Sequence, residues 1–138
     1  MSRLVKLMLL AFFAVSSPVS GFAEEKSEAT MAVWKRHVQN ATARDIDAVL
    51  KDFTDESVIV TSDRVIEGKA AIGAFFEEFL AGITPEAIKS IVVNAETAHG
   101  KVMVFNFTIG VAKRTFNDTA LIEDGKIKVL ATVNYAAE

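Results

Sequence analysis

The chain has no cysteine, only two histidines and only two prolines among its 138 residues. Without cysteine, the sequence excludes disulfides, thiol catalysis and thiolate metal sites. The two histidines, His37 and His99, are too far apart for the i, i+4 pair that a helical zinc site uses. We therefore expect neither a bound metal nor another cofactor, and a fold that is stabilised by packing alone.

Two common signatures of catalysis are also missing from the sequence. There is no serine elbow flanked by glycines and no glycine-rich loop that could hold a phosphate. Acidic residues outnumber basic ones by 18 to 15, which gives a net charge of −3. This sign of charge argues against nucleic acid as a partner.

Residues 1–23 have the pattern of a secretory signal peptide. Arg3 and Lys6 provide a positive start, and an almost wholly apolar run follows from Leu4 to Val15. This run is shorter than the roughly 20 residues of a membrane span, although an uncleaved anchor remains the alternative. Gly21 and Ala23 provide small residues at the −3 and −1 positions of a cleavage site. We expect cleavage after Ala23, a periplasmic or secreted protein, and no membrane association afterwards.

Residues 24–138 are enough for one compact domain with its own core. Loss of Arg3 and Lys6 would change its net charge to −5. We expect residues 24–27 to form a flexible arm and the helices to lie in the first half of the domain. Apolar residues recur at three- and four-residue spacing in three segments, which predicts helices over about 28–41, 46–53 and 69–81.

The remaining segments have the alternation and turn chemistry of strands. Short strands are expected around 57–61 and 65–66, and Pro85 is expected to end the helical region. Asp124-Gly125 is a strong signal for a two-residue hairpin turn, while Gly110 could mark a bend or bulge. Long strands are predicted over 87–97, 101–109, 111–122 and 126–135. Helices followed by an antiparallel meander indicate an α+β fold with the helices on one face of a curved sheet.

Asp118 is the first candidate for chemistry. In an alternating strand it shares one face with Phe116, Ala120 and Ile122, so it would lie among apolar side chains. Burying a carboxyl group is costly unless the group is paired or protonated. Burial is also the means by which enzymes raise the pKa of an acidic side chain. The alternatives are a strand bulge near Asn117 or a place at the rim of the sheet.

His37 is the second candidate, at the border of the buried stripe of the first helix. A histidine there can face a cavity and exchange protons, or it can simply pack its ring and leave one nitrogen in water. Trp34, one turn earlier, fits the core better than a ligand site. Asn106 interrupts the doubly apolar run VMVFNFTI, so it is a pocket donor, an interface residue or a solvent contact at the sheet edge.

Several features together resemble SnoaL-like domains of the nuclear transport factor 2-like superfamily. These are the order of helices and strands, the run DIDAVLKDFTDESVIV, Gly68 followed by Ile72 and Phe76, and the terminal NDTALIEDGKI. The resemblance covers nearly all of residues 28–133. It implies a cone-shaped, cystatin-like fold with an apolar cavity at one end, and dimers that form through the outer face of the sheet. It does not identify a reaction, because the superfamily includes isomerases, cyclases, dehydratases and non-catalytic binding modules.

The ketosteroid isomerase branch of the superfamily uses a helical tyrosine, a base carboxylate after the first strand and a protonated aspartate in the sheet. By this resemblance, His37 occupies the tyrosine position and Asp118 or Thr119 the position of the sheet aspartate. The base position falls near Thr61, which cannot take up a proton at neutral pH. This departure argues against steroid isomerase chemistry itself.

The sequence thus predicts an exported domain that binds a small, largely apolar or amphipathic molecule, with acid-base activity of the isomerase or dehydratase type as an open possibility. The alternative is a non-enzymatic homodimer whose cavity is filled by its own side chains. The expected catalytic residues are His37 and Asp118, and the expected ligand-binding residues are Trp34, Thr61, Phe76 and Asn106.

Overall fold

The computed structural model describes residues 19–137, so most of the predicted signal peptide lies outside the described part of the chain. The elements follow the order α1 (Val19–Thr42), α2 (Ile46–Leu50), β1 (Val58–Val60), β2 (Val65–Glu67), α3 (Lys69–Ala81), α4 (Pro85–Lys89), β3 (Ile91–His99), β4 (Val102–Ile109), β5 (Arg114–Glu123) and β6 (Lys126–Ala136). The strands form one six-stranded sheet in the order β2-β1-β6-β5-β4-β3. All pairs are antiparallel except β1 with β6.

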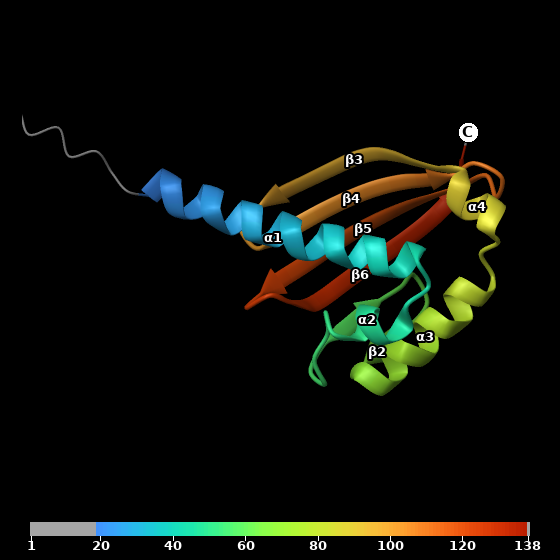
Figure 1. Ribbon diagram of the computed structural model, residues 1–138, viewed down its shortest axis with the longest axis horizontal. Coiled ribbons are helices and arrows are strands. Elements are labelled where there is room, and N and C mark those ends of the chain that lie inside the picture. Colours follow the sequence, from blue (N-terminus) through green and yellow to red (C-terminus); the bar gives the residue numbers. More distant parts are fainter. Residues whose placement is uncertain (1–18, 138) are drawn as a thin grey trace, which may run out of the picture.

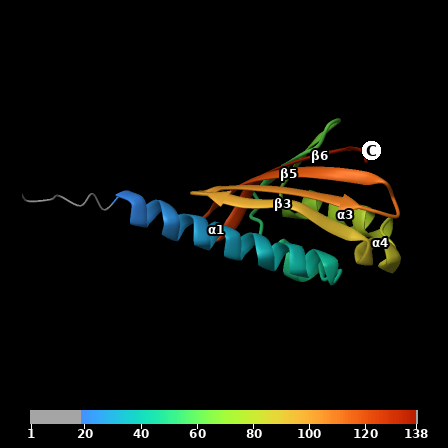
Figure 2. The same ribbon diagram turned by 90° about the horizontal axis from the view of Figure 1, so that it is seen from above.

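The helices lie on one face of the curved sheet (Figure 1). Figure 2 shows the same arrangement from above, with α1, α3 and α4 on one side of the long strands. The predicted α+β architecture is therefore confirmed. The core lies between the two layers, where Trp34, Phe53, Ile72, Met103 and Ile127 are almost completely buried.

Helix α1 begins earlier than the sequence predicted, because residues 24–27 are helical and not a flexible arm. The hydroxyl of Ser27 donates to the carbonyl of Ala23 and accepts from the backbone N–H of Gly100. The Thr30 hydroxyl donates to the Gly100 carbonyl over 2.7 Å. These bonds hold α1 against the β3–β4 turn at residues 27–30. The predicted cleavage site after Ala23 thus lies within the helix.

The segment after α3 also differs from the prediction. Pro85 does not end the helical region, because it is the first residue of α4. The backbone N–H of Ala87 in this helix donates to the side chain of Thr84. Proline suits the first position of a helix, since the N–H that it lacks has no partner there. Residues 87–89 are therefore helical, and strand β3 begins only at Ile91.

The predicted turn chemistry is largely confirmed. Asp45 caps α2 by accepting from the N–H of Ala48, and α3 begins after Gly68, whose φ is +86°. Asp124 and Gly125 both have positive φ, as the primed hairpin turn requires. Gly110 differs from its prediction, because it lies in the turn between β4 and β5. The bulges lie instead at Val93/Ala95 and Leu121/Ile122.

Candidate functional site

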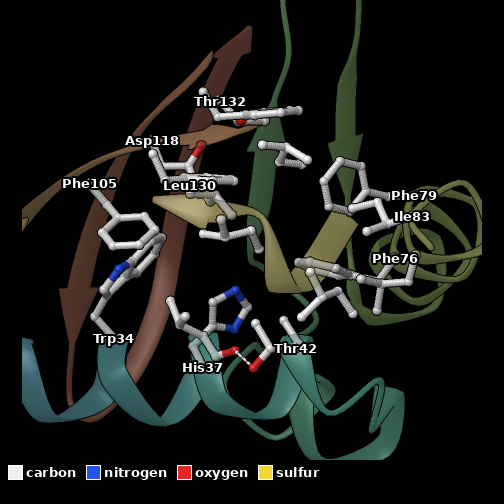
Figure 3. A pocket seen from close by; sticks show the side chains of 18 of the residues that line it. Trp34, His37, Thr42, Phe76, Phe79, Ile83, Phe105, Asp118, Leu130 and Thr132 are labelled. Atoms are coloured by element: carbon white, nitrogen blue, oxygen red, sulfur yellow. Dashed lines mark hydrogen bonds between the residues drawn. The ribbon is translucent and has the colours of Figure 1, made fainter. Parts of the chain in front are cut away.

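An apolar cavity of about 140 Å³ lies between α1, α3 and the inner face of the sheet. Phenylalanines from α3, β4 and β5 form much of its wall, and Trp34 lines it from α1 (Figure 3). An engineered apolar cavity of about 150 Å³ is large enough to hold benzene. The volume of the cavity therefore suits one small ring. The wall includes Trp34, His37, Phe75, Phe76, Phe79, Leu80, Phe105, Phe107, Phe116, Asp118, Leu130 and Thr132.

Asp118 lies in this apolar wall, on the inward face of β5. Its neighbours across the strands are Phe105 on β4 and Thr132 on β6. The Oδ1 atom of Asp118 is buried and accepts no hydrogen bond. Burial raises the pKa of Asp118 to about 6, and the Thr132 hydroxyl lowers it only in part. The carboxyl group can therefore gain or lose a proton near neutral pH.

His37 faces the same cavity from α1, and its side chain is almost fully buried. Its ring packs edge-on against Phe53 and Phe76, with centroid distances of 5.5 Å in both cases, and is tilted against Trp34. These aromatic contacts fix the plane of the imidazole ring. A fixed imidazole at an apolar cavity can exchange a proton with a ligand.

Behind His37 lies Asp52, which the sequence analysis did not single out. Its side chain is completely buried, with Oδ2 at 3.5 Å from Nδ1 of His37. Arg36 donates from Nε and Nη2 to the other carboxylate oxygen, Oδ1, over 2.8 Å and 2.5 Å. Burial raises the pKa of Asp52, but the nearby His37 and the hydrogen bonds and positive charge of Arg36 outweigh it and hold that pKa below its ordinary value. Asp52 is thus an ionised carboxylate in the core.

The buried polar atoms without a hydrogen-bond partner gather at this one place. In residues 19–137 they are Nε1 of Trp34, Nδ1 of His37, Oδ2 of Asp52 and Oδ1 of Asp118. Leaving such an atom unpaired costs about 1–3 kcal/mol. Three of these residues line the cavity and the fourth lies behind His37. Unpaired polar groups beside an apolar space are the arrangement expected of a ligand site.

The structure brings together four of the six residues predicted for the site. Trp34, His37, Phe76 and Asp118 all line the cavity. The inward facing of Asp118 that alternation predicted is therefore confirmed, whereas the roles of the four residues stay predictions.

Thr61 and Asn106 were wrongly placed at the cavity. The Thr61 hydroxyl bonds to Asp63 and Arg64 within the β1–β2 turn. Asn106 lies on the outer face of the sheet, where its amide bonds to Asn94 and Asn117. It alternates with the inward-facing Phe105 and Phe107, so it cannot point into the cavity.

The structure also adds residues that the sequence analysis missed. Thr132 is directly opposite Asp118 on β6, so its place follows only from the strand register. Asp52 and Arg36 are 16 residues apart and meet through tertiary packing. The only hint in the sequence that Arg36 lies near the site is that it precedes His37 on the same helix. The described residues contain no cluster of side chains suited to a metal ion and no helix long and apolar enough to cross a membrane.

Comparison with solved structures identifies the architecture. A candidate ketosteroid isomerase from Kribbella flavida matches with a TM-score of 0.66 and 16% identity, over 82% of this chain and 82% of that chain. A nuclear transport factor 2-like protein of unknown function from Burkholderia xenovorans matches with a TM-score of 0.62 and 19% identity, over 86% and 88%. The fold is nuclear transport factor 2-like.

A candidate polyketide cyclase from Sinorhizobium meliloti has the same nuclear transport factor 2-like fold, with a TM-score of 0.58 and 17% identity over 73% of this chain and 93% of that chain. At such identities the likeness shows the fold alone. No protein-family model and no curated protein sequence matches the chain.

Proposed function

We propose that this chain is a SnoaL-like domain that binds a small, largely apolar molecule with one polar group, and that His37 and Asp118 give it acid-base activity of the isomerase or dehydratase type. The observation that carries the proposal is the unpartnered carboxyl oxygen of Asp118 in the wall of an apolar cavity. A buried carboxyl with a raised pKa is what proton transfer near neutral pH needs.

The size of the cavity limits the substrate to about one six-membered ring. By the family resemblance, the position of the ketosteroid isomerase base falls near Thr61, which lies outside the cavity. The proposed chemistry therefore differs from that of a steroid isomerase in both substrate size and base. His37 is the residue that can take up a proton, while Asp118, which is protonated below its pKa of about 6, donates a hydrogen bond to the substrate's oxygen.

Cyclohex-3-enone tests this proposal, because it is a single ring whose conversion into the conjugated cyclohex-2-enone needs only a proton shift. We expect the protein to accelerate this isomerisation, followed by ultraviolet absorbance, and the variants His37→Gln and Asp118→Asn to lose most of the acceleration. Substituting Glu77, which is exposed on α3, by Gln provides the matched control. A rate equal to that of buffer would rule out the acid-base part of the proposal.

The outer face of the sheet supports a second proposal, that two copies of the chain form a homodimer through it. Val102, Val104, Val133 and Tyr135 are each more than 40% exposed there. Amides from three strands and the Tyr135 hydroxyl form a hydrogen-bonded row among them. A face that combines exposed apolar side chains with uncharged amides is typical of an interface. If the cyclohexenone assay fails, a dimeric binding module is the remaining function.

Export to the periplasm or out of the cell, with cleavage after Ala23, also belongs to the proposal. It is supported by the charged, apolar and small-residue pattern of residues 1–23. Ser27 and Thr30, which hold α1 against the β3–β4 turn, come after the cleavage site and stay with the mature domain. Mass spectrometry of the exported protein should find Glu24 as its first residue. An intact first segment would contradict this.

A further inference from the structure

Asp52 is held rigidly from two sides. Its Oδ1 atom accepts both hydrogen bonds from Arg36 on α1, and its backbone carbonyl accepts from the N–H of Ile127 on β6 over 2.7 Å. The carboxylate therefore cannot turn without breaking the contacts to Arg36. Its second oxygen, Oδ2, is directed toward His37 by this arrangement.

Oδ2 of Asp52 and Nδ1 of His37 are both buried, and neither has a hydrogen-bond partner elsewhere. They are 3.5 Å apart, so a small rotation of the imidazole would join them. An ionised carboxylate only accepts hydrogen bonds, and therefore Nδ1 must carry the hydrogen. In the neutral ring this leaves Nε2, on the other side of the imidazole, with its lone pair.

We propose that Asp52 is a positioning residue that holds neutral His37 as the Nδ1–H tautomer, so that Nε2 faces the cavity as a hydrogen-bond acceptor and base. The catalytic meaning of this inference rests on the proposed function. The tautomer itself is a property of the protein without ligand. It can therefore be tested separately.

The surroundings of His37 offer no competing charge. The titratable and charged groups that face it are Asp52 after α2, Arg36 on α1 through Asp52, and Asp118 across the cavity on β5. The other elements packed against the ring contribute the aromatic side chains of Phe53 and Phe76. Asp52 is thus the charged group that determines which ring nitrogen of His37 carries the hydrogen.

This arrangement selects a class of substrate, namely a small cyclic β,γ-unsaturated ketone with a hydrogen on the carbon between the carbonyl and the double bond. The C–H bond breaks, a new N–H bond forms at Nε2 of His37, and the electron pair stays on the substrate as an enolate. Protonated Asp118 donates a hydrogen bond to the enolate oxygen. The imidazolium then returns its proton to a different carbon, and the Asp52 carboxylate stabilises the charged ring in between.

Nitrogen-15 NMR of histidine-labelled protein measures the tautomer directly, because protonated and unprotonated ring nitrogens have different chemical shifts. Only His37 and His99 give signals, and the variant His99→Gln assigns them. We expect an excess of about tenfold or more of the Nδ1–H form at His37, since hydrogen bonds to charged groups are strong enough for that ratio. A majority of the Nε2–H form would overturn the proposal.

The variant Asp52→Asn should reverse the tautomer. Arg36 would hold the amide oxygen in the place of Oδ1, so the amide NH₂ would face His37 and make Nδ1 an acceptor. An asparagine in place of the carboxylate behind a catalytic histidine is known to impose the wrong tautomer in this way. The control Asp55→Asn, at an exposed position on the same segment, should leave the ratio unchanged. An unchanged ratio in Asp52→Asn would contradict the proposal.

If Asp52→Asn does not fold, the tautomer of His37 measured in the wild-type protein tests the proposal on its own. The two proposals also fail differently. A correct tautomer without turnover of cyclohex-3-enone would refute the proposed reaction and keep the positioning role. Turnover with the opposite tautomer would refute the positioning role only.

Discussion

Asp118 and His37 face one cavity from opposite walls, Asp118 from the sheet and His37 from helix α1 (Figure 3). The carboxyl group is surrounded by apolar side chains, whereas the histidine has an ionised carboxylate behind it. The two groups therefore meet the same cavity from different surroundings.

The raised pKa of Asp118 predicts a specific dependence of stability on pH. In the unfolded chain the pKa of this group is near 3.8, and in the fold it is about 6. Between these values the unfolded state releases the proton first, so the free energy of unfolding falls as pH rises and levels off above pH 6. The loss is at most about 3 kcal/mol, because Asp118 keeps partial contact with solvent.

Urea denaturation of the wild type and of Asp118→Asn from pH 4 to pH 8 measures this effect. The variant should lack the fall in that window and be the more stable protein at pH 7 unless the amide itself is left unpaired. Asp52 contributes in a different window, because its lowered pKa means that its stabilisation is lost only at pH below 3.8. If the free energy of unfolding had the same pH dependence in the wild type and the variant, Asp118 would not be buried as described.

The cavity volume predicts how substitutions change ligand size. Leu80→Ala removes a buried side chain from the wall and should destabilise the fold by about 2–5 kcal/mol. It should also strengthen the binding of indole, a two-ring compound that needs more space than a single ring. Calorimetric titration with indole compares the two proteins. Equal binding of indole to both would mean that the cavity does not set the size of the ligand.

Thr61→Ala should leave ligand affinity unchanged, because the Thr61 hydroxyl is used within the β1–β2 turn. A modest loss of stability, of about 1 kcal/mol, is expected from the lost hydrogen bonds. Thr132→Val is the matched test inside the cavity, where the lost hydroxyl lies beside Asp118. It should alter the affinity for cyclohexanone. The prediction would fail if Thr61→Ala weakened binding and Thr132→Val did not.

Local sequence signals predicted much of this fold. Alternation placed Asp118 on the inner face, and Asp124-Gly125 fixed the last hairpin. Asn106 was misplaced because its strand is apolar on both faces. The alternation of side chains therefore could not show which face of the strand meets the helices. Thr61 was misplaced by the family resemblance, because its hydroxyl is used within the β1–β2 turn.

Asp52 could not be found from its surroundings in the sequence. It follows a short helix and precedes Phe53, and nothing local distinguishes it from the exposed acidic residues nearby. Its burial depends on Arg36 and on the backbone of β6, which is distant in the chain. Contacts of this kind follow from the packing of elements and not from the pattern of any one element.

The dimer proposal predicts that one charge on the outer face of the sheet prevents association. Val104 lies on β4, between β5 and β3, and is 45% exposed on that face. Val104→Lys should convert a dimer into a monomer in sedimentation experiments at micromolar concentration, since a lysine in an interface core is unpaired. Val111→Lys, in the β4–β5 turn, is the control. A wild-type protein that is already monomeric would refute the dimer.

The central claim, that the cavity binds one small ring with a polar group, is tested most directly by titration with phenol. Trp34 is the only tryptophan in the chain and lines the cavity, so its fluorescence reports occupancy. We predict a saturable change with a dissociation constant of about 1 mM, which suits a ligand of this size. Binding should be several-fold weaker for benzene and for phenol with the variant Asp118→Asn. No saturable change with either compound would contradict the account.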